Sequence, residues 1–251
     1  MKKSHHALVY PHTSHRGLGV YRSRRHLAAT LFFVAVPPLF LLLFSRVAQV
    51  AARPLFADFM VSLLRLAIAY VIAAVLGWLL AAAFYRGRRA TVALPVFDVL
   101  QSFPTYAALP IATLVFGPSN RTVIFFLIFA IIWPVFFSVV SQLRLIRRDW
   151  EEAVAISRLS GIAYIRLFLL PASMPGLITG SIVGLGDGWE ALVATEIIVH
   201  VPHGLGGFFQ SYSSHTTITA FGILGLLILI FSINKLIWLP LLEHSRILYE
   251  E

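Results

Sequence analysis

The 251-residue chain contains no cysteine. Disulfide scaffolds, cysteine-ligated zinc, iron–sulfur clusters and thiol catalysis are therefore excluded. Charge is also scarce, because only 12% of the residues are Asp, Glu, Lys or Arg, against about 25% in an ordinary soluble domain. A soluble globule needs more charged side chains than this to cover the core that it buries. The composition therefore excludes a soluble globular domain.

Three signatures of catalysis are missing as well. The chain has no Gly-x-x-x-x-Gly-Lys-Ser/Thr segment, so it cannot supply a Walker-type ATP site. It has neither His-Glu-x-x-His nor Gly-x-Ser-x-Gly, and Asp98 and Asp187 lack the local sequence of an intramembrane catalytic pair. We therefore expect no enzymatic activity, no cofactor and no metal site in this chain.

Hydrophobic residues make up 59% of the sequence, and the mean hydropathy is +0.84. Apolar stretches long enough to cross a bilayer lie at residues 27–45, 59–84, 91–116, 122–143, 167–199 and 217–240. We expect an all-α polytopic membrane protein with about six transmembrane helices. The first and third stretches are expected to be broken by Pro37, Pro38, Pro95, Pro104 and Pro110.

The distribution of basic residues predicts the orientation. Sixteen of the 20 Lys and Arg residues fall in the two terminal regions and in the second-to-third and fourth-to-fifth connections. Only Arg46, Arg53 and Arg121 fall in the other connections, and Arg65 lies inside the second stretch. Basic residues concentrate on the cytoplasmic side of a membrane, so both termini are predicted to be cytoplasmic. This topology explains the net charge of +9 without a nucleic-acid partner.

The chain is expected to begin with a cytoplasmic tail (1–26), followed by the first transmembrane helix with an outer loop (27–58), and to end with a second tail (244–251). An export signal is rejected for the start, because the charged region is too long and five more spans follow. The first tail is basic and rich in histidine, and contact with anionic lipid is favoured over a metal-binding tail. Its histidines are His5, His6, His12, His15 and His26.

Residues 144–161 form a longer and better organised segment than a turn between two membrane spans requires. Asp149 and Glu152 have the spacing of a capping box, and Gly161 is a natural C-terminal stop, so a helix is predicted over about 149–161. This helix is too short to span the bilayer. One side is apolar or small, through Trp150, Ala153, Val154 and Ser157, so it is expected to lie on the cytoplasmic surface and to present a side to a partner.

This segment resembles the EAA loop of binding-protein-dependent ABC transporter permeases. Further matches resemble the subgroup that imports nitrate, sulfonates, taurine or bicarbonate, and the resemblance covers about residues 59–243. The matching segments are Leu100-Gln101-Ser102-Phe103-Pro104, Leu114-Val115-Phe116-Gly117, Glu152-Ala153-Val154, Leu170-Pro171 and Pro171-Ala172-Ser173-Met174-Pro175-Gly176. The family's pattern has a Gly where this chain has Arg158 and an Ile where it has Phe168, so Gly161 is expected to displace the turn.

The resemblance implies a MetI-like permease fold with a cytoplasmic coupling helix, in the inner membrane of a bacterium. It implies cytoplasmic ABC ATPase subunits that bind ATP and Mg, a second permease copy or similar chain, and a periplasmic or extracellular solute-binding protein. The residues implied to contact the ATPase are Trp150, Glu151, Glu152, Ala153, Val154, Arg158, Leu159 and Gly161. The implied substrate is a small anion or an organic sulfonate-like solute.

Two further patterns lie in the apolar stretches. Asp98, Gln101, Ser102 and Thr105 recur at helical spacing and predict a polar stripe, either in a translocation pathway or in hydrogen bonds between helices. A ladder of small residues recurs every fourth position and predicts close helix packing, either inside one copy or between two. Its members are Gly176, Gly180, Gly184 and Gly188.

Asp187, Glu190 and Glu196 form the densest acidic cluster of the apolar region. They are candidate pathway residues; the alternatives are pairing with Arg65 or Arg121, or exposure at the outer mouth. Unpaired acids in a pathway would repel small anions. Embedded acids also suit an ion-coupled secondary transporter, which is the second hypothesis for this chain. That hypothesis leaves the predicted cytoplasmic helix unexplained.

The outer connection at about 200–216 contains His200, His203 and His215. A metal site there would lack an acidic partner, so docking of an external solute-binding protein, as the resemblance implies, is favoured.

Overall fold

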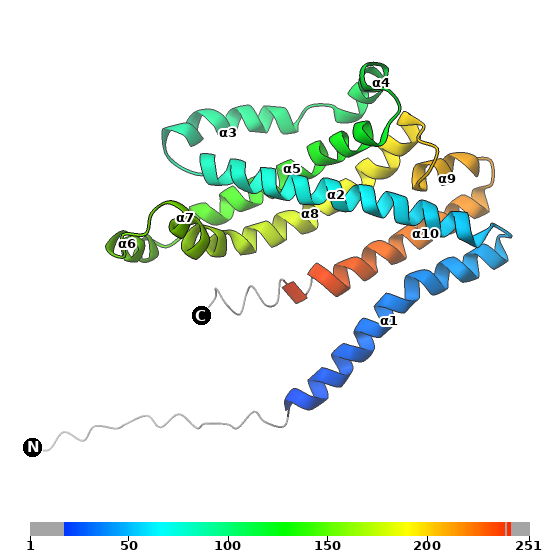
Figure 1. Ribbon diagram of the computed structural model, residues 1–251, viewed down its shortest axis with the longest axis horizontal. Helices are drawn as coiled ribbons and strands as arrows, with labels where there is room; N and C mark the ends of the chain where they lie inside the picture. The colour runs from blue at the N-terminus through cyan, green and yellow to red at the C-terminus, as the bar shows by residue number, and fades with distance from the viewer. Residues whose placement is uncertain (1–17, 239, 242–251) are drawn as a thin grey trace, which may run out of the picture.

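The computed structural model of the chain describes residues 18–238, 240 and 241; for residues 18–29, Arg148 and Glu151 it describes the backbone alone. All regular secondary structure in these residues is helical (Figure 1). The elements in chain order are α1 (Leu18–Val47), α2 (Ala52–Phe84), α3 (Gly87–Gln101), α4 (Thr105–Phe116), α5 (Asn120–Arg144), α6 (Arg148–Ile156), α7 (Gly161–Tyr164), the π-helical segment η2 (Ile165–Leu169), α8 (Leu170–Val199), α9 (Leu205–Ser211), α10 (Thr216–Ile233) and the π-helical segment η3 (Asn234–Trp238).

Helices α2, α5 and α8 form the core of the bundle and lie side by side along its long axis (Figure 1). α5 is the most buried of the three, and its apolar side chains recur about every fourth position as in a helix covered along one face. The fully buried members of this row are Leu127, Ile131, Val135 and Val139. The face of α8 that meets this row is its glycine ladder.

The glycines allow the backbones of α5 and α8 to touch. A Cβ atom on Gly176 would lie 2.6 Å from the carbonyl oxygen of Ser138, and one on Gly180 would lie 2.7 Å from the Cα of Val135. Cβ atoms on Gly184 and Gly188 would lie 3.0 and 2.9 Å from atoms of Ile131. The sequence leaves open whether the ladder packs inside one chain or between two copies. In the structure it packs against α5 of the same chain.

Hydrogen bonds hold α2 against another side of α8. The indole N–H of Trp78 donates to the hydroxyl oxygen of Ser173 at 2.8 Å. The hydroxyl of Tyr70 donates to the hydroxyl oxygen of Ser181 at 2.9 Å. Both serines are fully buried. Such bonds between side chains are favourable where no water competes for the same donors, so they fix how α2 and α8 are aligned.

The described residues contain five or six candidate membrane spans, against the expected six. Within the described residues, five helical stretches are long and apolar enough to cross a bilayer. The pair α3 and α4, whose axes meet at 79°, makes a sixth if the two helices form one bent span. The expected polar stripe is therefore divided, because Thr105 lies on α4 and the other three residues lie at the end of α3.

The prolines act less uniformly than expected. Only Pro104 lies at a break, directly before α4, where the ring disfavours a helical conformation in the preceding Phe103. Pro37 and Pro38 lie inside α1, Pro95 inside α3 and Pro110 inside α4, without ending those helices. Apolar helices in membranes tolerate proline because neighbouring groups can satisfy the freed carbonyls. The prediction that these four prolines break the first and third spans is wrong.

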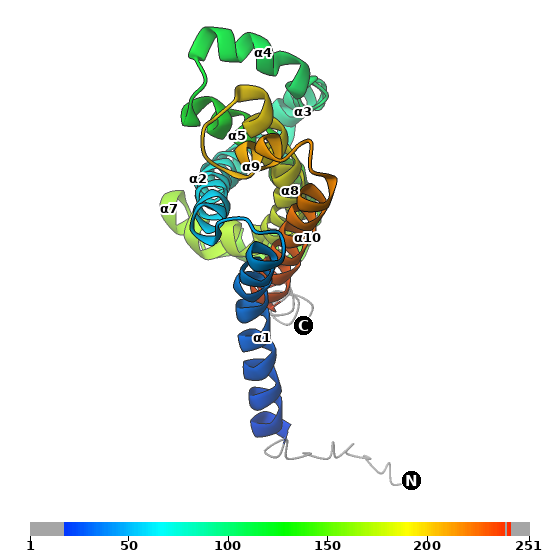
Figure 2. The same ribbon diagram turned by 90° about the vertical axis from the view of Figure 1, so that its right-hand side faces the viewer.

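The two ends of the bundle differ. α6 and α7 lie at one end and α9 at the other, while α1 extends away from the bundle on the side opposite to α4 (Figures 1 and 2). α1 begins at Leu18 and α2 at Ala52, earlier than the expected starts at 27 and 59, because hydropathy windows exclude helical turns that carry charge. The tail predictions for residues 1–17 and 244–251 lie outside the described residues.

Substitution Gly180→Ala is expected to destabilise the protein by about 1–3 kcal/mol, because the new methyl group overlaps the backbone of α5. The measurement is the midpoint of thermal unfolding in detergent micelles. Gly186→Ala in the same helix is the matched control, since no atom lies within 4 Å of its Cβ position. An equal unfolding temperature for the two variants would contradict backbone contact between α5 and α8.

Candidate functional site

The short helix predicted over about 149–161 is present as α6, nine residues long. Its N-terminal cap is Arg147, which makes no capping hydrogen bond through its side chain. The Arg147 guanidinium instead donates to the carboxylate of Asp149 at 2.7 Å. The capping box of Asp149 and Glu152 is therefore wrong: Asp149 lies inside the first turn, where a carboxylate still interacts favourably with the positive end of the helix dipole.

The end of α6 also differs from the expectation. The helix stops at Ile156 rather than near Gly161, and Arg158 takes a left-handed backbone conformation with φ of 51°. This is the position where the resembling family has glycine, so the turn is not displaced. Gly161, with φ of 57°, begins α7 instead of ending α6. An arginine in this conformation carries a steric cost that glycine would avoid.

α6 is an amphipathic helix with no buried residue among those described. Glu152 and Ala153 are exposed, and Trp150 is 41% exposed. Ile156 and Ile162, on either side of the turn that follows α6, are 83% and 82% exposed. Of the expected coupling residues, Val154 and Leu159 are half-buried, and the side chain of Glu151 lies outside the described part. The segment thus presents an apolar surface beside charged groups.

Hydrogen bonds connect this segment to two core helices. The hydroxyl groups of Tyr164 in α7 and Tyr85 at the end of α2 lie 3.3 Å apart. The carbonyl oxygen of Tyr85 accepts a 3.0 Å hydrogen bond from the Nε of Arg144 at the end of α5. The guanidinium carbon of Arg86 lies 4.9 Å from the centre of the Tyr85 ring. Tyr85 therefore joins the ends of α2 and α5 to the segment that follows α6.

The residues of the predicted polar stripe are partly bonded to one another. The Gln101 amide donates to the Asp98 carboxylate at 2.7 Å, and the Ser102 hydroxyl donates to the Asp98 carbonyl oxygen at 3.0 Å. The Thr105 hydroxyl donates to the carbonyl oxygen of Phe103. Asp98, Gln101 and Ser102 are exposed on the bundle. They form a polar patch at the bend between α3 and α4.

Asp187 and Glu190 lie one turn apart on α8 and are exposed. α4 packs against α8, and its Tyr106 lies within electrostatic range of both carboxylates. Neither acid forms a salt bridge with the described residues. The two acids therefore lie on an exposed surface of α8. This surface adjoins the polar patch at the bend between α3 and α4 only through the contact between α4 and α8.

Glu196 is in a different environment, fully buried at the end of α8 near α9. Its carboxylate lies 2.5 Å from the Arg65 guanidinium, and it accepts 2.8 Å hydrogen bonds from the Ser62 hydroxyl and a 2.9 Å bond from the backbone N–H of Gly206. The assignment of Glu196 to the pathway is corrected: it has no contact with solvent, and the alternative of pairing with Arg65 is the one observed.

The partners of Arg65 come from two more elements. Its guanidinium donates to the side-chain oxygen of Asn120, at the start of α5, at 2.7 and 3.1 Å. It also donates to the carbonyl oxygen of His203 at 2.7 Å. A cation inside an apolar span requires such partners, so Arg65 itself was the signal for this cluster. The sequence did not identify Ser62 and Asn120, which have no motif of their own.

The same cluster positions α9. The Asp58 carboxylate accepts from the backbone N–H of Gly204 at 2.9 Å, and the Ser62 hydroxyl oxygen accepts from that of Leu205 at 2.8 Å. Gly204 has φ of 124°, and a Cβ there would lie 2.6 Å from the Arg65 guanidinium. Glycine is therefore required at this turn. In the described residues, no three His, Asp or Glu side chains are arranged to hold a metal ion.

Residues 73–237, from within α2 to within η3, match the family described as binding-protein-dependent transport system inner membrane component. The chain belongs to this family. Membership assigns it to the membrane component of a transport system, a multi-pass protein of the inner membrane, rather than to the enzymes.

Curated relatives are named for different solutes. A nitrate import permease protein of Leptolyngbya laminosa is 33% identical over 164 residues, which cover 64% of this chain and 58% of that protein. A bicarbonate transport system permease protein of Synechococcus elongatus is 29% identical over 184 residues, covering 70% and 66%. A taurine transport system permease protein of Escherichia coli is 30% identical over 117 residues, covering 47% and 42%. The chain thus spans less than two thirds of each relative.

Substitution Glu196→Ala is expected to destabilise the protein by about 3–5 kcal/mol, because it leaves the buried Arg65 guanidinium without its counter-charge. Thermal unfolding in detergent measures the loss. Removal of both charges in Arg65→Leu/Glu196→Leu is expected to recover part of it. Asp149→Ala is the control, because its pair with Arg147 is about 70% exposed. A small effect of Glu196→Ala, equal to that of the control, would contradict a structural role for the buried pair.

Proposed function

We propose that the chain is the transmembrane permease subunit of an ABC importer, which forms the translocation pathway and couples it to ATP hydrolysis in a separate ATPase subunit. The observation that carries the proposal is α6. A helix of nine residues is only marginally stable alone in water, and this one keeps the side chains of Trp150 and Ile156 exposed. Exposed apolar surface of this kind is typical of a protein-binding site. Family membership supports an ATPase as the partner.

The placement of charge supports the orientation. The end of the bundle with α6 also contains Arg86, Arg144, Arg147, Arg158 and Arg166, whereas the end with α9 belongs to connections with few basic residues. The positive-inside rule then makes the α6 end cytoplasmic and, with an even number of spans, both termini cytoplasmic as well. In this orientation an ATPase reaches α6 from the cytosol and a solute-binding protein reaches α9 from outside.

We call α6, the turn after it and α7 the coupling segment (residues 148–164). Its contacts with the bundle provide a route by which motion can be transmitted. α6 is followed by α7, η2 and α8 with little intervening chain, so a displacement of α6 acts on the cytoplasmic end of α8. Tyr164 and Tyr85 extend the displacement to the end of α2, and Arg144 extends it to α5. The three core helices then move as a packed unit. Alternating access by such rigid-body movement is the general behaviour of bundled transporters.

The pathway is proposed to lie along α3, α4 and α8, where a second copy or a similar chain covers exposed polar groups. Asp98 is exposed in the C-terminal half of α3, and a carboxylate facing lipid costs about 2.5–3.5 kcal/mol. Asp187 and Glu190 present the same problem on α8. Burial between two permease chains, or contact with water in a pathway between them, removes that cost.

The substrate is proposed to be a small anion or an organic sulfonate-like solute. Three relatives named for nitrate, bicarbonate and taurine support this class. Asp187 and Glu190 would repel an anion, so they are proposed to serve in helix contacts at the interface and not in solute binding. The alternative function, an ion-coupled secondary transporter, would use these acids directly, and it gives α6 no role.

Substitution Glu152→Arg is expected to reduce co-purification of the ATPase with the permease, because it reverses a charge in the exposed face of α6. The measurement is the ratio of the two subunits after affinity purification of the permease from cells that express both. Arg89→Glu, an exposed charge reversal in the first turn of α3, is the control and should leave that ratio unchanged. A secondary transporter would co-purify with no ATPase in either variant.

Double substitution Asp187→Asn/Glu190→Gln is expected to leave uptake of the anion unchanged or to raise it modestly, since removal of negative charge cannot weaken the binding of an anion. Uptake of labelled nitrate, bicarbonate and taurine into vesicles with the ATPase and binding protein present measures the effect. Loss of uptake without loss of folded protein would assign the acids to solute or proton binding and favour the alternative function.

A further inference from the structure

Arg158 combines two costly features at the surface of the coupling segment. Its φ of 51° is a conformation that glycine adopts more easily, and its guanidinium forms no hydrogen bond or ion pair with the described residues. The side chain is exposed and neutralises no acidic neighbour among the described residues. Helix termination alone does not account for arginine here, because glycine would terminate α6 with less strain.

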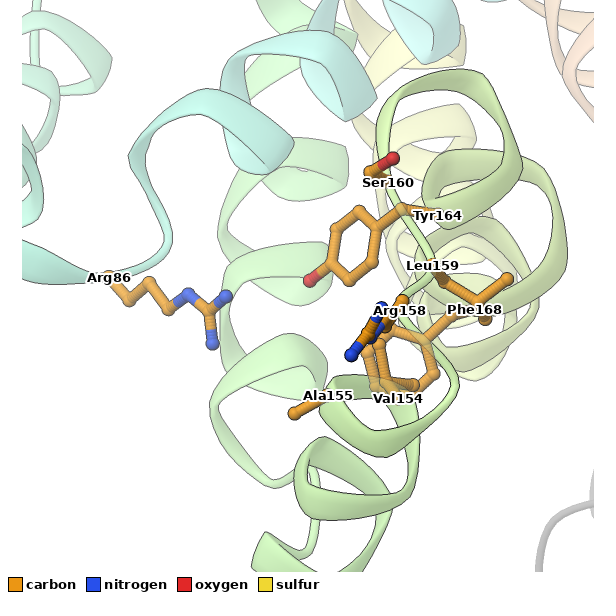
Figure 3. Close-up of a pocket in the computed structure, with 8 residues that line it drawn as sticks. All are labelled: Arg86, Val154, Ala155, Arg158, Leu159, Ser160, Tyr164 and Phe168. Carbon is orange, nitrogen blue, oxygen red and sulfur yellow. The ribbon is translucent and has the colours of Figure 1, made fainter.

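The Arg158 side chain lines a pocket of about 430 Å³ between the coupling segment and the α2–α3 turn. The guanidinium groups of Arg158 and Arg86 and the hydroxyl of Tyr164 are directed toward the same space (Figure 3). The lining residues are Arg86, Val154, Ala155, Arg158, Leu159, Ser160, Tyr164 and Phe168, of which none is acidic. The pocket is therefore a basic hollow with hydroxyl donors and apolar walls.

We propose that this pocket receives an acidic side chain of the ATPase subunit, with Arg158 as its principal partner. The inference rests on the proposed function, because it requires that a partner covers α6. Val154 and Ala155 belong both to α6 and to the pocket wall, so a protein that covers α6 also covers the pocket. A guanidinium removed from water in this way needs a counter-charge, and a carboxylate matches its fork of donors.

The position of the pocket gives this contact a role in coupling. A carboxylate between Arg158 and Tyr164 would lie against the side chain whose hydroxyl reaches Tyr85 at the end of α2. The ATPase would then act on the bundle at two points, through α6 and through the α2–α3 turn. Two separated contacts resist rotation of the short helix in its binding groove, which a single contact does not.

Substitution Arg158→Gly separates the effect of backbone strain from the effect of charge. Removing the strain should stabilise α6, whereas removing the charge should weaken ATPase binding. Relief of backbone strain should slow amide hydrogen exchange across α6 about fivefold. Loss of the guanidinium should weaken ATPase binding about tenfold or more and reduce its dependence on salt. Arg89→Gln, an exposed charge removal outside the pocket, should leave the affinity near that of wild type.

A second variant identifies the partner group. In Arg158→Lys, a carbodiimide can join the introduced amine to a carboxylate in contact with it, and mass spectrometry of the assembled complex locates the joined peptides. A link to an Asp or Glu of the ATPase is expected. Links confined to the permease itself, or an Arg158→Gly variant that binds the ATPase as tightly as wild type, would overturn this inference alone. Failure of the wild-type chain to bind any ATPase would overturn the proposed function as well.

Discussion

The contact between the backbones of α5 and α8 determines the arrangement of the other helices. Lipid provides no hydrophobic gain when two apolar helices associate, so close packing has to supply the stabilisation. Glycine at every fourth position of α8 allows that approach, and the buried serines on an adjacent side then align α2 by hydrogen bonds. With these three helices fixed, α8 has Glu196 at one end and leads into the coupling segment at the other.

The two ends of this core are stabilised in opposite ways. At the end with α9, Arg65 and Glu196 form a buried network that connects α2, α5, α8 and the turn before α9. At the other end, α6 has no buried side chain in the described part, and the connection to the bundle passes through tyrosine hydroxyls. A buried network at one end and an incompletely covered helix at the other are consistent with the proposed coupling to a separate motor.

Some of this arrangement is predictable from the sequence because the physical demand is local. A four-residue glycine period specifies close packing, and a lone arginine in an apolar span demands a partner, although neither identifies that partner. Asn120 comes from a distant position, so only the fold brings it to Arg65, and Ser62 lies one turn before Arg65 on α2 but bonds to Glu196. Proline was a poor guide to breaks, since its effect depends on whether neighbours satisfy the freed carbonyls. The C-terminal end of α6 differs from the expected one because Arg158 adopts a conformation that propensity assigns to glycine.

The central claim is that α6 faces the cytosol with a surface open to a partner. The chain has no cysteine, so single substitutions Ala153→Cys in α6 and Ser214→Cys after α9 introduce unique thiols at exposed positions. A membrane-impermeant maleimide should label Ala153→Cys in inverted vesicles only, and Ser214→Cys in right-side-out vesicles only. Added ATPase should then protect Ala153→Cys from the reagent. Labelling of Ala153→Cys in right-side-out vesicles would contradict the account.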